Sequence, residues 1–213
     1  MSSIAKTTLD ESSHYVIAFS YSGGQGIGAF DGIGYSWGFD GSQLYPGYSS
    51  CWSKEKLGWQ TALEITQSGN YTIKRTDAMP DPSGNDVYAV KISTGFRQDE
   101  YMCGEFQVYR GPDSGLNTNC PIDPDSNQRK CCPIDPVSGE TKCQGLALYH
   151  IDESVGYYNE GHPGQVDWPA NGNHYKIAVV PQDGSYDLEK GSNVGHHDYF
   201  FKNGDMVEGS FTD

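Results

Sequence analysis

The stretch GLALYHIDES, at residues 145–154, passes from an alternating apolar segment into a polar one. Its first part, residues 146–151, has the alternation and the aromatic and aliphatic content that are typical of a β-strand. His150, Asp152 and Glu153 stand where this predicted strand ends. Functional side chains often emerge at such ends, although a strand that only runs into a polar turn has the same pattern. The stretch therefore predicts a strand of a sheet and marks a candidate site at its end.

Further strands are predicted on both sides of this segment. Each has alternating, β-branched or aromatic residues, and turn sequences such as PDPSGND at residues 80–86 separate them. The predicted strands cover residues 15–21, 70–75, 87–93, 103–110 and 175–180. Ser50 is a candidate N-cap for a short helix over residues 51–57, which Gly58 would end. This order predicts a single mainly β domain, with a minor α+β character, built from antiparallel strands, a few short helices and long loops rich in Gly, Pro and Cys.

Composition and charge narrow the class of protein. The 213 residues are enough for one domain of ordinary size, and 27 Gly and 11 Pro indicate many turns rather than long helices. The formal charge of −14 argues against nucleic acid, which needs clustered Lys and Arg. It suits an extracellular protein and calcium, although a merely solubilising acidic surface explains it as well. No apolar run approaches the roughly 20 residues of a membrane span, and no signal peptide is visible, so secretion would need a targeting segment outside this chain.

Two similar cysteine-bounded sequences, CPIDPDSNQRKC and CPIDPVSGETKC, follow one another at residues 120–143. Structural zinc sites usually draw ligands from C-x₂₋₄-C pairs, whereas each repeat spaces its cysteines as C-x₁₀-C. The repeats are polar turn sequences with no apolar face to bury, so disulfide bonds are the expected means of holding them. The symmetric pairing of the six cysteines joins Cys120 to Cys131, Cys132 to Cys143 and Cys51 to Cys103.

Residues 187–198 contain a candidate calcium site. Oxygen-bearing side chains stand at Asp187, Glu189, Asn193 and Asp198, among glycines that can offer carbonyl oxygens, and a loop bent in this way can bring such groups to one cation. A transition metal on the adjacent histidines at 196 and 197 is less favoured, because neighbouring side chains usually diverge. The first cysteine repeat also opens like a calcium loop, but it lacks the required glycine and final carboxylate and is interpreted as a polar turn.

Two features bear on contacts at the surface. Asn70-Tyr71-Thr72 is an acceptor sequence for N-glycosylation, usable if the chain is secreted. Residues 22–48 form a tract rich in Gly and Tyr, too dense in glycine for a helix. We expect this tract to be exposed and to serve contacts with other molecules.

Three stretches occur in the chain in this order: SWGFDGSQLYPGYSSCWSKEKLGW at residues 36–59, GLALYHIDES at 145–154 and NGNHYKIAVVPQDGSYDLEKGSN at 171–193. Together they resemble the M6, or immune inhibitor A-like, secreted zinc metallopeptidases. The resemblance implies that residues 1–213 are part of one such peptidase domain, with residues 120–143 as an insertion. It also implies that His150, Asp152 and Glu153 belong to the polar wall of the domain, and that residues 187–198 hold a stabilising calcium ion.

The catalytic part of such a peptidase is not found in the chain. In the family an H-E-x-x-H helix precedes the Ser-Trp-Gly segment and supplies two zinc ligands and the general base, but the residues before Ser36 contain no such motif. By alignment on Ser36, the Met-bearing turn of the family falls on Ile33. We therefore carry over no catalytic residues and expect no zinc on this chain.

These observations lead to two expectations for function. The first is a non-catalytic, M6-derived extracellular module that serves binding or assembly with protein partners or with further copies of itself, stabilised by disulfides and calcium. The alternative is a carboxy-terminal fragment of an active secreted zinc metalloendopeptidase whose H-E-x-x-H site lies outside this chain. The missing motif and Ile33 favour the first expectation.

Overall fold

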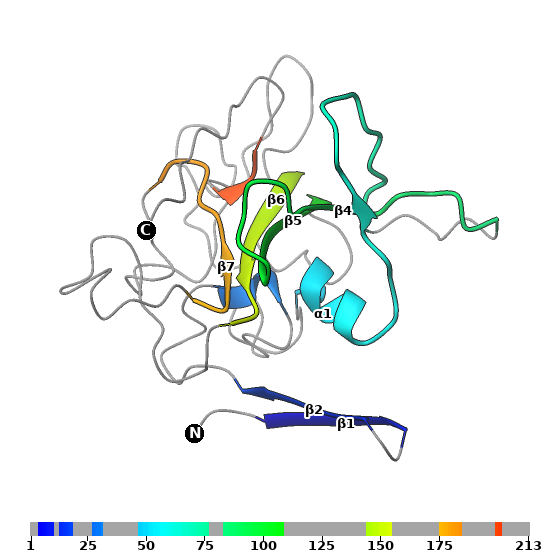
Figure 1. Cartoon of the computed structure of the whole chain (residues 1–213), viewed down its shortest axis with the longest axis vertical. Helices are drawn as coiled ribbons and strands as arrows, with labels where there is room; N and C mark the ends of the chain where they lie inside the picture. Colours follow the sequence, from blue (N-terminus) through cyan, green and yellow to red (C-terminus); the bar gives the residue numbers. More distant parts are fainter. Residues whose placement is uncertain are drawn as a thin grey trace, which may run out of the picture.

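The described part of the chain is organised around one five-stranded sheet, with a short helix packed on one face (Figure 1). The computed structural model describes residues 4–10, 13–18, 27–31, 47–76, 83–108, 144–154, 175–184 and 199–201. Its elements are β1 (Ile4–Asp10), β2 (Ser13–Ala18), the 3₁₀ helix η1 (Gly28–Phe30), α1 (Cys51–Lys56), β3 (Leu63–Glu64), β4 (Ala89–Ile92), β5 (Glu100–Val108), β6 (Gln144–Asp152) and β7 (Ile177–Val179). The predicted mainly β class is confirmed.

β5 and β6 form the centre of the sheet, whose strand order is β3-β4-β5-β6-β7. They pair antiparallel over their whole lengths, from Glu100 opposite Asp152 to Val108 opposite Gln144. β4 and β7 add to the two sides in antiparallel direction, as the sequence predicts, whereas the short β3 runs parallel to β4. The sheet is therefore mixed. β1 and β2 pair with each other as a separate antiparallel sheet.

Alternation along β5 and β6 sends side chains to two hydrophobic clusters, one on each face of the sheet. The first cluster includes Cys103 of β5 and Tyr149 of β6 and extends to residues of α1. The second consists of Met102, Leu148 and Phe201, with partly buried neighbours. Because both faces pack against apolar side chains, β5 and β6 are buried along most of their lengths.

Gly104 of β5 allows the second cluster to approach the backbone closely. A Cβ atom added at this position would lie 3.0 Å from Cδ2 of Leu148 and 3.3 Å from side-chain atoms of Leu146 and Val90. Side chains from β4 and β6 therefore occupy the space that any other residue would need.

Helix α1 forms as its capping residues predict. Ser50 has an extended backbone, and its Oγ accepts a hydrogen bond from the amide of Ser53 at 3.3 Å. Leu57 closes the helix, and Gly58 follows with a φ of 70°, the left-handed conformation that favours glycine after a helix. A helix of six residues is not stable by itself, so contacts with the rest of the domain hold it in place.

Asp31 fixes the start of α1 from within the core. Its Oδ2 accepts hydrogen bonds from the amide of Ser50 at 2.9 Å, from the hydroxyl of Ser50 at 2.5 Å and from the hydroxyl of Ser53 at 2.6 Å. Asp31 follows Ile27 and Phe30, which are buried in the first cluster. The expectation that the Gly- and Tyr-rich tract is exposed is therefore wrong for Ile27 and Phe30, because their apolar side chains are buried in the core.

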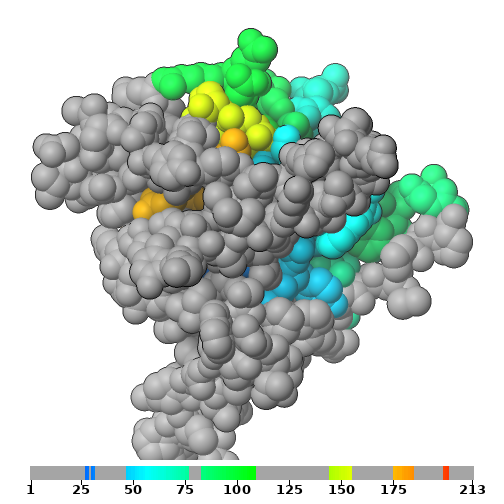
Figure 2. Space-filling view, turned by 90° about the horizontal axis from the view of Figure 1, so that it is seen from below, coloured from blue at the N-terminus to red at the C-terminus, as the bar shows by residue number. Residues whose placement is uncertain are grey.

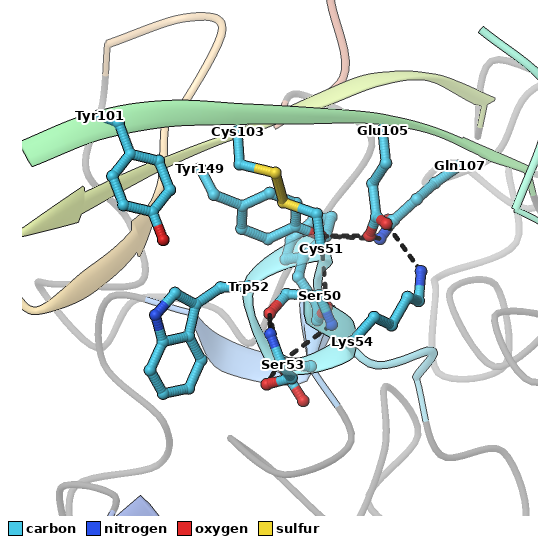
Figure 3. The surroundings of a disulfide bond; sticks show 12 residues. Ser50, Cys51, Trp52, Ser53, Lys54, Tyr101, Cys103, Glu105, Gln107 and Tyr149 are labelled. Carbon is cyan, nitrogen blue, oxygen red and sulfur yellow. Dashed lines mark hydrogen bonds and ion pairs between the residues drawn. A yellow bond between two sulfur atoms is a disulfide. The ribbon is translucent and has the colours of Figure 1, made fainter. Parts of the chain in front are cut away.

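A disulfide bond joins Cys51, the first residue of α1, to Cys103 in the middle of β5 (Figure 3). The two Cα atoms are 6.5 Å apart, and both side chains are buried. The expected pairing of these two cysteines is thus confirmed. The other two expected pairs fall at residues 120–143, outside the described residues.

The predicted strand at residues 70–75 is wrong. Within this segment only Arg75 is paired, in an isolated bridge with Phe106. Residues 66–72 are exposed, and the hydroxyl of Tyr71 donates a hydrogen bond to the carbonyl of Gln67 at 2.7 Å. Alternation does not produce a strand unless a neighbouring strand bonds the backbone along the segment. Here β5 contacts only its end, through the bridge of Arg75 with Phe106.

Removing the Cys51–Cys103 bond is expected to destabilise the fold. The two cysteines are 52 residues apart in sequence, and closing a loop of this length contributes about 4 kcal/mol to the free energy of unfolding in the chain-entropy model. The Cys51→Ala/Cys103→Ala variant should therefore unfold at a lower urea concentration than the parent.

Peptide mapping of the parent without reduction is the control, and it should recover one cross-linked pair that contains Cys51 and Cys103. The same map tests the two pairs expected at residues 120–143. An unchanged urea midpoint in the double variant would show that the bond does not stabilise the fold.

Candidate functional site

His150 and Asp152 at the end of β6, and Glu153 directly after it, contact three different sets of residues. His150 is 5% exposed, and its Nε2 lies 2.7 Å from Oε1 of Glu100 on the neighbouring strand β5. Asp152 is also buried, and its Oδ1 accepts hydrogen bonds from the amide of Ser154 at 2.9 Å and from its hydroxyl at 2.5 Å. The first two residues thus stabilise the strand pair and the turn that follows it, whereas Glu153 reaches α1.

Glu153 connects the end of β6 to α1 and to β5. Its Oε1 accepts hydrogen bonds from the indole Nε1 of Trp52 at 2.8 Å and from the hydroxyl of Tyr101 at 3.2 Å, and it lies 2.8 Å from Nζ of Lys56. Lys176 Nζ lies 3.9 Å from Oε2 and donates to the backbone carbonyl of Glu153 at 3.3 Å. Figure 3 shows Trp52 and Tyr101 on the same side of the sheet.

These contacts shift two pKa values in opposite directions. Burial alone would raise the pKa of Glu153, but hydrogen bonds from Lys56 and Trp52, together with the charges of Lys56 and Lys176, lower it below its usual value. Burial raises the pKa of Tyr101, and the negative charges of Glu153 and then of Glu55 raise it further. At neutral pH Glu153 is therefore a carboxylate and Tyr101 a neutral phenol that donates a hydrogen bond to it.

A polar cavity of about 370 Å³ lies next to Glu153. Its walls come from α1, β4, the turn between β4 and β5, the start of β5, and the residue after β6. The charged groups in the walls are Glu55, Lys56, Lys91, Asp99 and Glu153. In the space-filling view the residues near the β4–β5 turn (green) lie beside the end of β6 (yellow-green), where the amide of Glu153 donates to the carbonyl of Asp99 at 2.8 Å (Figure 2). The volume falls in the range of roughly 300–1,000 Å³ that is usual for small-molecule sites.

A second polar group is buried beside the disulfide (Figure 3). Glu105 is fully buried, and its Oε2 lies 2.7 Å from Nζ of Lys54. Its Oε1 accepts hydrogen bonds from Nε2 of Gln107 at 3.0 Å and from the hydroxyl of Tyr149 at 3.2 Å. Because a buried carboxylate is costly unless it is paired and hydrogen-bonded, this group stabilises the contact between α1 and the sheet.

Asn70, the acceptor of the glycosylation sequence, is exposed. It lies in the exposed residues 66–72, in the segment that follows β3 and extends beyond the sheet (Figure 1). A glycan at this position would meet solvent rather than the core, so the location is compatible with the predicted modification.

Several residues of the sequence-predicted sites lie outside the described residues. They are the four proposed calcium ligands, Ile33 and the cysteines of residues 120–143: Asp187, Glu189, Asn193, Asp198, Ile33, Cys120, Cys131, Cys132 and Cys143. Within the described part of the chain, no three His, Cys, Asp or Glu side chains are grouped closely enough to hold a metal ion. A separate search of the same residues finds no helix with the length and apolar character of a membrane span.

Sequence reasoning missed the partners of Glu153. Trp52 is 101 residues away from it, so no local spacing relates the two. A signal is nevertheless present in the cysteines. Once Cys51 is paired with Cys103, the residues close to them in sequence, Trp52 and Tyr101 among them, are expected to be neighbours in space.

Comparison with known proteins gives no match: no family model, no curated protein and no solved structure matches the chain. The resemblance to M6 peptidases therefore rests on the three sequence stretches.

Replacing Glu153 by Gln should make the stability of the protein less dependent on pH. The folded-state pKa of Glu153 is lowered, so its contribution is present above the unfolded-state value of about 4.3 and is lost as the pH falls through the folded-state value. Glu153→Gln should lower the free energy of unfolding by about 1 kcal/mol at pH 7. The difference from the parent should shrink steadily as the pH is lowered below the unfolded-state value.

Urea unfolding of both proteins at several pH values measures this difference. The exposed Glu64 provides a matched control, since Glu64→Gln removes the same charge with little effect on stability. A difference between the parent and Glu153→Gln that is the same at every pH would mean that the charge of Glu153 does not stabilise the contact with α1.

Proposed function

We propose that this chain is a non-catalytic extracellular module, derived from an M6-like peptidase domain, that serves binding or assembly. The proposal rests on the contacts made by the polar side chains at the end of β6, which all bind residues of the same domain. The side chains of His150, Asp152 and Glu153, which the resemblance assigns to the polar wall, all bind other parts of the same domain. These contacts stabilise the fold without a substrate or a catalytic metal.

The contacts of His150 and Glu153 show which parts of the fold each residue joins. His150 forms a buried pair with Glu100, so it links two strands at the centre of the sheet. Glu153 accepts hydrogen bonds from Trp52 and Tyr101, so it links the sheet to α1. Residues with such roles are needed for folding whether or not the domain cleaves peptides, which is why a non-catalytic descendant would retain them.

The cysteines support an extracellular location. Disulfide bonds form and persist in oxidising compartments and are rare where thiols are kept reduced. The bond between Cys51 and Cys103 lies in the core and joins two elements that are distant in sequence. The exposed position of Asn70 adds to this support, because glycosylation of an acceptor sequence takes place on secreted chains.

Two features support binding as the function of the module. One is the polar cavity beside Glu153, which has the volume of a small-molecule site. The other is the segment after α1, where Trp59 is 67% exposed and Leu63 and Tyr71 are exposed as well. Exposed aromatic side chains are enriched in contacts between proteins, so this segment suits a protein partner or a further copy of the chain.

The proposal predicts that the purified chain neither carries stoichiometric zinc nor cleaves protein substrates. Metal analysis measures the first quantity, and assays with casein and gelatin measure the second, with a related active peptidase as the positive control. Cleavage that a chelator abolishes would overturn the proposal in favour of an active zinc metalloendopeptidase.

The predicted calcium site at residues 187–198 leads to a separate expectation. A cation that binds the folded state and not the unfolded state raises the melting temperature with its concentration. Calcium, compared with magnesium at equal concentration, should therefore raise the melting temperature of the chain, and the Asp187→Asn/Asp198→Asn variant should respond less. A melting temperature that does not change with calcium would show that the site does not bind it.

A further inference from the structure

The cavity beside Glu153 contains charged groups that the fold itself does not pair. Lys56 and Glu153 neutralise each other at 2.8 Å. Lys91 also lines the cavity, with Nζ 3.9 Å from the centre of the Tyr101 ring, but no carboxylate of the described residues forms an ion pair with it. The aromatic face holds the ammonium in place by a cation–π interaction. Its hydrogen-bond donors therefore line the cavity without an anionic partner there.

Two carboxylates in the same wall also lack an ion-pair partner among the described residues. Glu55 belongs to α1, and Asp99 belongs to the turn before β5. In the part of the chain that the structure describes, neither carboxylate has a hydrogen-bond or ion-pair partner. After Lys56 and Glu153 are set aside as a pair, the cavity presents one unpaired ammonium group and two unpaired carboxylates.

We propose that this cavity binds a basic amino acid, such as free L-lysine or L-arginine. At neutral pH such a molecule carries one carboxylate and two cationic groups, which is the complement of the unpaired charges in the wall. Lys91 binds the carboxylate of the ligand, and Glu55 and Asp99 bind its α-ammonium group and its side-chain cation. Charge-assisted hydrogen bonds of this kind are stronger than neutral ones. The inference rests on the proposed binding function and names its ligand class.

The mixed charges of the wall disfavour simpler ligands. An anion attracted by Lys91 would also meet Glu55 and Asp99, and a cation attracted by these carboxylates would meet Lys91 and Lys56. Like charges placed close together weaken binding. A ligand that carries both signs avoids this cost, and the volume of about 370 Å³ has room for a small molecule of this kind.

Isothermal titration of the full chain with L-lysine, with L-arginine and with four analogues of L-lysine tests the proposal. L-Lysinamide lacks the carboxylate, Nα-acetyl-L-lysine lacks the α-ammonium group, L-norleucine lacks the side-chain cation, and L-glutamate carries the opposite side-chain charge. L-Lysine and L-arginine should bind, and each analogue should bind about tenfold more weakly or worse, because it leaves a charged group of the wall unpaired.

Two variants assign the roles of the wall residues. Lys91→Met should weaken binding of L-lysine about tenfold. The same variant should bind L-lysinamide at least as well as the parent does, because the amide has no carboxylate to lose and no longer meets the like charge of Lys91. Asp99→Asn should weaken binding of both molecules. Lys74 and Asp86, which lie 3.4 Å apart away from the cavity, provide matched controls as Lys74→Met and Asp86→Asn. These controls should bind L-lysine like the parent, and circular dichroism checks that all variants are folded.

The result that would overturn the proposal is the absence of saturable binding of L-lysine and L-arginine at concentrations up to about 10 mM. Equal binding of L-norleucine and L-lysine would also overturn it, as would a Lys91→Met variant that binds L-lysine like the parent. These outcomes would leave the zinc and cleavage measurements unchanged. Failure of the ligand assignment is thus distinguishable from failure of the proposed function, which only chelator-sensitive cleavage would overturn.

Discussion

The attachment of α1 to β5 is the contact on which the rest of the described structure depends. The helix is too short to be stable by itself, yet it covers the central strands and supplies one wall of the cavity. Three different interactions hold it at successive residues. Asp31 accepts the hydrogen bonds at its start, the Cys51–Cys103 bond joins it covalently to β5, and Lys54 reaches the buried Glu105. Because each interaction fixes a different atom of α1, together they set both its position and its rotation.

Because side chains alternate between the two faces of a strand, every second residue of β5 faces α1 and the end of β6. Tyr101, Cys103 and Glu105 share one face of the strand, and each supplies a different contact: a hydrogen bond to Glu153, the disulfide and an ion pair. The intervening Gly104 lies on the other face, beneath the second cluster. The buried carboxylate of Glu105 requires its cationic partner on α1, since removing that partner would leave an unpaired charge in the core. The face toward α1 therefore specifies one packing of the helix, while the other face contributes apolar burial.

The sequence predicted the parts of this arrangement that follow from local rules. Alternation located the central strands, the pair of Ser50 and Gly58 located the helix, and the symmetry of the cysteine repeats left Cys51 and Cys103 for each other. The strand that alternation predicted at residues 70–75 is wrong, because a strand also needs a neighbouring strand along its length, and alternation does not indicate whether one is present. The contacts of Glu153 were not predictable in this way. They join residues from α1, β5 and the segment after β6, and lysines such as Lys56 usually stand at the surface with no structural role.

The charges around Glu153 divide into those that the fold uses and those that it leaves available. The ion pair between Lys56 and Glu153 joins α1 to the end of β6. Lys91 and Glu55 are half-buried in the same wall and contribute no such link. A charge that is partly removed from water without an oppositely charged partner loses hydration. The Tyr101 ring offsets part of this loss for Lys91, but no group of opposite charge pairs with Lys91 or Glu55 in the described part of the chain. A ligand of complementary charge pairs the charges that the domain leaves unpaired. The position of the cavity agrees with this division, since it lies where the end of α1, the β4–β5 turn and the end of β6 meet, and where side chains need not fill the core.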